Sequence, residues 1–78
     1  MSWTTRAVEA HIAEAVRRSR RARGWSQREL AEAINVSRRQ VGRIEDASAS
    51  VDALTLYAIC GALDVRFADV FPPVWHDA

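Results

Sequence analysis

Three arginines at positions 38, 39 and 43 carry the clearest chemistry in this chain. With about 100° between successive helical residues, Val41 and Ile44 point to one side of their segment. Arg39 and Arg43 then point to the opposite side, and Arg38 lies on the flank near the start. A guanidinium group forms paired hydrogen bonds with phosphate oxygens or with O6 and N7 of guanine. The pattern indicates a surface for nucleic acid, against the alternative of an ordinary solvated helix face.

Gly42 lies between the two outward arginines, so their surface contains a point without a side chain. A glycine inside a helix costs about 1 kcal/mol relative to alanine. The residue leaves room for a sugar or a thymine methyl group to come close.

Two short helices joined by a tight turn would position these residues. Ser26 is followed three residues later by Glu29. Ser37 is followed in the same way by Gln40. Each pair has the pattern of a capping box, in which side chains satisfy free amide groups at a helix start. Two helices separated only by residues 35–37 must cross steeply, which predicts a helix-turn-helix at about 26–45.

The stretch from Ile12 to Phe71 resembles the lambda-repressor-like (Cro-type, or XRE) helix-turn-helix domain. The matching pieces, in order, are Arg20, the run Arg-Gly-Trp-Ser-Gln at 23–27, Glu29-Leu30-Ala31, Val-Ser at 36–37, Arg-Ile-Glu at 43–45, and Thr55-Leu56 with Ile59 and Ala62-Leu63. The resemblance implies an all-α, compact five-helix domain that binds double-stranded DNA. Such domains are usually dimeric transcriptional repressors or activators.

The resemblance places the helix at about 38–46 in the DNA major groove. The N-terminal part of this helix contacts base edges in such motifs. We therefore expect base contacts from Arg38, Arg39 and Arg43.

Phosphate contacts are expected at the start of the preceding helix. A glutamine at the position of Gln27 holds a backbone phosphate in this family, assisted by amide groups of the helix start. We therefore expect contacts from Ser26, Gln27 and Arg28. The resemblance also implies a structural ion pair between Arg20 and Glu45.

The loop after Glu45 departs from the family pattern. The family often has a glycine and then a lysine or arginine that grips phosphate, whereas this chain reads Asp46-Ala47-Ser48-Ala49. Asp46 would repel DNA. The phosphate contact of this loop is therefore in doubt, which favours weaker binding or binding that needs a partner.

The remaining pattern predicts one domain over residues 1–78, with a core at about 8–71. Gly24 would end the first helix and Asp52 would cap the fourth. The expected helices are about 8–22, 27–34, 38–46, 53–63 and 66–71.

Charge is distributed unevenly along the chain, although the net charge is only +1. Residues 17–43 hold nine arginines against Glu29 and Glu32, whereas residues 44–78 hold one arginine against six acids. This asymmetry is expected of a protein with a nucleic-acid face. The arginines at 17, 18, 21 and 23 are interpreted as a solvated face that adds diffuse attraction to DNA.

Other classes of function find little support. No apolar run approaches the roughly 18 residues of a membrane helix, and the N-terminus lacks a signal-peptide pattern. The single cysteine, Cys60, cannot form an internal disulfide and is expected in the core. His11, Cys60 and His76 lack metal-ligand spacing. We expect no metal, no cofactor and no enzymatic activity.

The sequence thus predicts a cytoplasmic, nucleoid-associated regulator of transcription that binds specific DNA sequences. Repression, in which the bound protein blocks polymerase or a competing regulator, is favoured over activation. A homodimer is expected through the last helix and tail, whose apolar residues are Phe67, Val70, Phe71, Val74 and Trp75. Two alternatives remain open: an antitoxin that binds a partner toxin and represses its own operon, and a phage or plasmid architectural protein.

Overall fold

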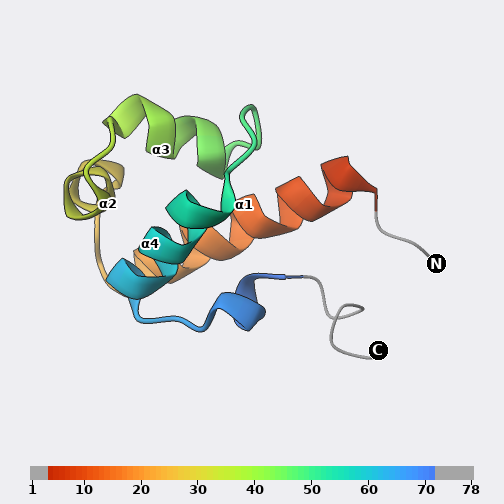
Figure 1. Cartoon of the computed structure of the whole chain (residues 1–78). Coiled ribbons are helices and arrows are strands. Elements are labelled where there is room, and N and C mark those ends of the chain that lie inside the picture. The colour runs from red at the N-terminus through yellow and green to blue at the C-terminus, as the bar shows by residue number, and fades with distance from the viewer. Residues whose placement is uncertain (1–3, 72–78) are drawn as a thin grey trace.

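This computed structural model describes residues 4–71, which fold into four α-helices and one short 3-10 helix (Figure 1). No strand occurs in that range. The expected all-α fold is confirmed, except that its last element is a 3-10 helix. The elements are α1 (Thr5–Ala22), α2 (Gln27–Ile34), α3 (Arg38–Glu45), α4 (Ala53–Leu63) and η1 (Phe67–Val70).

Side-chain caps fix the start of every α-helix. Thr4 Oγ1 accepts from Ala7 N–H at 3.1 Å, so α1 begins three residues before the predicted Val8. At α2 the capping box is complete: Ser26 Oγ accepts from Glu29 N–H at 3.0 Å, and Glu29 Oε1 accepts from Ser26 N–H at 2.8 Å. The hydroxyl of Ser37 makes the corresponding bond at α3.

Asn35 forms the turn between α2 and α3. Its φ of 60° and ψ of 48° lie in the left-handed region, which asparagine tolerates better than most residues. Asn35 and Val36 N–H groups donate to carbonyls of α2 and close its last turn. The α3 helix therefore starts two residues later, across the tip of α2 (Figure 1).

The core is built from one apolar stripe of each helix. In Figure 1, α1 passes diagonally behind α4, and it contacts α3, α4 and η1. Val70 of η1 is 2% exposed and packs into this core, so the prediction that it belongs to an exposed dimer patch is wrong. The core residues are Ile12, Ala15, Val16, Leu30, Ala31, Val41, Ile44, Leu56, Ile59, Cys60, Leu63 and Val70.

None of the helices in residues 4–71 combines the length and apolar character needed to span a bilayer.

Candidate nucleic-acid interface

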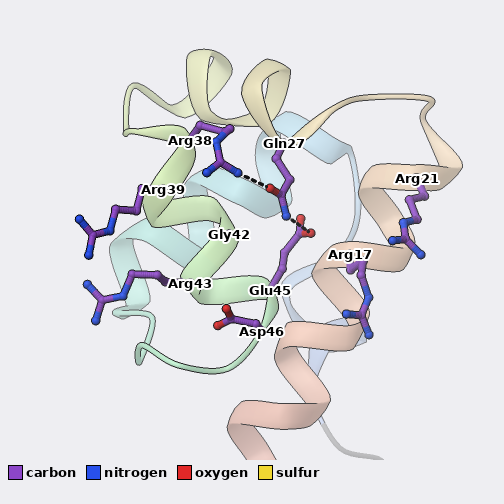
Figure 2. Close-up of a pocket in the computed structure, with 9 residues that line it drawn as sticks. All are labelled: Arg17, Arg21, Gln27, Arg38, Arg39, Gly42, Arg43, Glu45 and Asp46. Carbon is purple, nitrogen blue, oxygen red and sulfur yellow. Dashed lines mark hydrogen bonds between the residues drawn. The ribbon is translucent and has the colours of Figure 1, made fainter.

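The outer side of α3 presents two arginines to solvent. Arg39 and Arg43 are exposed and extend away from α1 (Figure 2). On the opposite side of α3, Val41 and Ile44 are 1% and 2% exposed. Within residues 4–71 the two guanidinium groups make no hydrogen bond to other side chains. Both groups are therefore free to meet a ligand that approaches α3.

Arg38 differs from the other two arginines because it is already bound. Its Nη1 donates to Gln27 Oε1 at 2.8 Å, across the gap between α3 and the start of α2 (Figure 2). The sequence pattern gave no sign of this contact. Arg38 is still exposed, so its guanidinium retains N–H groups for a second partner.

Gln27 connects Arg38 to the interior. The other end of its amide, Nε2, donates to Glu45 Oε1 at 3.1 Å. Both ends of this half-buried amide thus have partners within the protein. The neighbouring residues of the expected phosphate contact, Ser26 and Arg28, are exposed, although the Ser26 hydroxyl also caps α2.

Glu45 of α3 and Arg20 of α1 form a buried, bidentate ion pair, as the resemblance implies. Arg20 Nε lies 2.6 Å from Glu45 Oε2, and Arg20 Nη2 lies 2.9 Å from Glu45 Oε1. A third bond runs from Arg20 Nη1 to the carbonyl of Trp25 at 2.7 Å. The hydrogen bond to Glu45 raises the pKa of Arg20. The pair ties the end of α3 to α1.

A hollow of about 400 Å³ opens between α1 and α3. Figure 2 shows Arg17 and Arg21 of α1 along one side, α3 along the other, and Gln27 and Glu45 between the two helices. Sequence reasoning treated Arg17 and Arg21 only as part of a solvated face. The hollow is lined by Arg17, Arg21, Gln27, Arg38, Arg39, Gly42, Arg43, Glu45 and Asp46.

The loop after α3 is held by its own hydrogen bonds. Asp46 Oδ1 accepts from Ser48 N–H at 2.9 Å. Hydrogen bonds from the side chain and backbone of Ser48 lower the pKa of Asp46, so its carboxylate stays ionised at the edge of the hollow. Ala47 adopts a left-handed φ of 60°.

Residues 4–71 hold no group of three potential ligands placed for a metal ion. Cys60 is 3% exposed, and burial raises the pKa of its thiol.

Residues 16–70 match a family model described as helix-turn-helix (HTH_3). The chain belongs to the HTH_3 helix-turn-helix family. The match includes α2, α3 and every residue that lines the hollow. HTH_3 membership confirms the family resemblance on which the sequence-based fold prediction rests.

Several proteins with known names are similar to this HTH_3 chain. The HTH-type transcriptional regulator SutR of Escherichia coli K12 is 36% identical over 62 residues, which make up 80% of this chain and 35% of SutR. The clp gene regulator ClgR of Corynebacterium glutamicum is 34% identical, with a TM-score of 0.76 and 80% of each chain covered. The restriction-modification controller protein C.AhdI of Aeromonas hydrophila is 27% identical, with a TM-score of 0.77 over 81% of this chain and 96% of that chain.

Proposed function

We propose that this chain is a transcriptional regulator that binds specific sequences of double-stranded DNA by inserting α3 into the major groove. The observation that carries the proposal is the division of α3, with Val41 and Ile44 buried and Arg39 and Arg43 exposed on the opposite side. Family membership and the names of SutR and ClgR support the same function. The site of action is the nucleoid of the cytoplasm.

Arg39 reads a base, and Gln27 positions the protein on the backbone. Arg39 is near the N-terminal end of α3, where this motif meets base edges. Gln27 lies at the first position of α2, beside the exposed Ser26 and Arg28. To hold a phosphate, the Gln27 amide adds a contact to those it makes with Arg38 and Glu45. Arg38 and Arg43 complete the base-contacting set.

A binding titration on a selected operator and a scrambled duplex tests these assignments. Arg39→Ala should weaken operator binding by about 1–3 kcal/mol and relax preference at one base pair. Gln27→Ala should weaken both duplexes alike. If Arg39→Ala weakens both duplexes equally, Arg39 is a phosphate contact. If the wild-type chain binds no duplex, the proposed function is wrong.

The regulator acts as a symmetric dimer and represses by steric exclusion. Within residues 4–71 the exposed large apolar side chains lie on α4, which has no charged residue along its length. Leu54 and Tyr57 are 84% and 71% exposed, three residues apart on one face. The ring centroid of Tyr57 lies 6.3 Å from that of Phe67, and the ring centroid of Phe67 lies 5.0 Å from that of Phe71. An apolar patch of this kind favours an interface.

This interface keeps Phe67 and Phe71 from the sequence-based prediction, adds α4, and omits the buried Val70. The other two expected residues, Val74 and Trp75, lie outside the described residues. Light scattering at high micromolar concentration should give twice the chain mass for the wild type, and Leu54→Glu should give the monomer. A wild-type monomer would refute the dimer. Co-purification of Leu54-dependent hetero-complexes would instead favour the antitoxin alternative.

A further inference from the structure

Two arginines of α1 line the hollow that α3 borders on the other side. Arg17 and Arg21 are four residues apart, so they project from one side of the helix. Figure 2 shows both on the wall opposite Gly42 and Arg43. These arginines therefore belong to a shaped site, in contrast to Arg6 and Arg18, which are exposed and lie outside the hollow.

The hollow has an excess of positive charge among its lining residues, although Arg17 is also paired with Glu14 outside the lining. Five arginines line it against two carboxylates. One of the carboxylates, Glu45, is already paired with the buried Arg20. The other, Asp46, accepts hydrogen bonds from its own loop. An anion with several oxygens would therefore meet more positively than negatively charged side chains in the lining of the hollow.

We propose that Arg17 and Arg21 bind a phosphate of the DNA backbone in this hollow. The inference rests on the proposed function, because a strand that flanks α3 in the major groove passes the space between α3 and α1. The opposite wall includes Gly42, where a Cβ would lie 3.6 Å from Gln27 Oε1 and 3.7 Å from Arg38 Nη1. The α1 site supplies the backbone grip that residues 46–51 lack, since that loop contains no lysine or arginine.

Glu14 competes with the phosphate for Arg17. The two side chains, three residues apart on α1, form an ion pair, with side-chain exposures of 37% for Arg17 and 51% for Glu14. Backbone binding must exchange this carboxylate for a phosphate. Glu14 therefore sets how tightly the chain holds any duplex, whatever its sequence.

The test compares two double variants that each remove two positive charges from α1. Arg17→Gln with Arg21→Gln removes the proposed contacts, and Arg6→Gln with Arg18→Gln is the matched control. Affinity for a scrambled duplex is measured between about 50 and 200 mM salt, where each phosphate contact contributes about 0.9 to the logarithmic salt slope. Circular dichroism verifies that every variant is folded.

The Arg17/Arg21 variant should lower the slope by about 0.9, so that the wild-type fall in affinity across this range is about three- to four-fold larger than that of the variant. The control should change the slope far less. Glu14→Gln should tighten binding in the wild type and have little effect in an Arg17→Gln background.

Equal slope changes in the two double variants would overturn the inference, because they would show diffuse attraction only. Unchanged slopes in both would overturn it as well. In either case a wild type that binds the selected operator through Arg39 leaves the proposed function standing.

Discussion

Arg20 and Glu45 should be among the most costly residues to change. Their side chains are 8% and 2% exposed, and two direct hydrogen bonds join them. Arg20→Met removes the cation and retains much of its volume. The Glu45 carboxylate is then left buried with Gln27 as its remaining donor.

The magnitude follows from this burial. Loss of one partner of a buried pair costs about 3–5 kcal/mol, whereas an exposed pair is worth about 0–1 kcal/mol. Total stability for 78 residues is roughly 4–12 kcal/mol. Arg20→Met should therefore remove about a quarter or more of the free energy of unfolding. The double variant Arg20→Met with Glu45→Leu should recover much of this loss, because no charge remains buried.

Urea denaturation followed by far-ultraviolet circular dichroism measures these free energies, with an m-value that should stay constant. Glu14→Gln is the control, because it breaks an ion pair on an exposed part of α1. A loss for Arg20→Met no larger than that of Glu14→Gln would refute the reasoning. So would a double variant that is less stable than Arg20→Met alone.

Three other changes have defined outcomes. A Cβ at Gly42 would lie 3.6 Å from Gln27 Oε1, which is an ordinary contact. Gly42→Ala should therefore raise stability by about 1 kcal/mol and yet weaken DNA binding. Stability and affinity that change in the same direction would contradict this. Ala47→Gly should remove the strain of an alanine in the left-handed region and so stabilise the protein by about 1 kcal/mol. An unchanged urea midpoint would contradict this. The Thr55 backbone N–H lowers the pKa of Asp52, so its cap stabilises above about pH 3.9 and is lost as pH falls further. Asp52→Asn should flatten that acid limb of the stability curve, and an identical limb would exclude the effect.

Local signals in the sequence predicted most helix boundaries. The ranges 27–34 and 53–63 agree with α2 and α4, because each has a capping side chain and a clear stop. The α1 helix was predicted too short, since Thr4 was not identified as its cap. The α3 helix ends at Glu45 instead of 46, and Asp46 is its C-terminal cap.

The site was predicted only as far as helical periodicity allows. Periodicity places Arg39 and Arg43 on the outer side of α3, but it cannot say how α1 crosses α3. The hollow, with Arg17 and Arg21 in its wall, depends on that crossing. The bond from Arg38 to Gln27 likewise joins residues eleven apart on two helices, a contact that no single helix encodes.

The bond between Arg38 and Gln27 divides α3 into fixed and replaceable positions. Arg38 continues a chain of contacts through Gln27 to Glu45 and so helps to hold the two helices in register. Arg39 and Arg43 have no such structural role, because their exposed side chains extend away from the body of the protein (Figure 2). Under the proposed function, changes at residues 39 and 43 should therefore alter the target sequence while the scaffold stays intact. Under the same proposal, a change at residue 38 should alter a DNA contact and also break the hydrogen bond between α3 and Gln27 of α2.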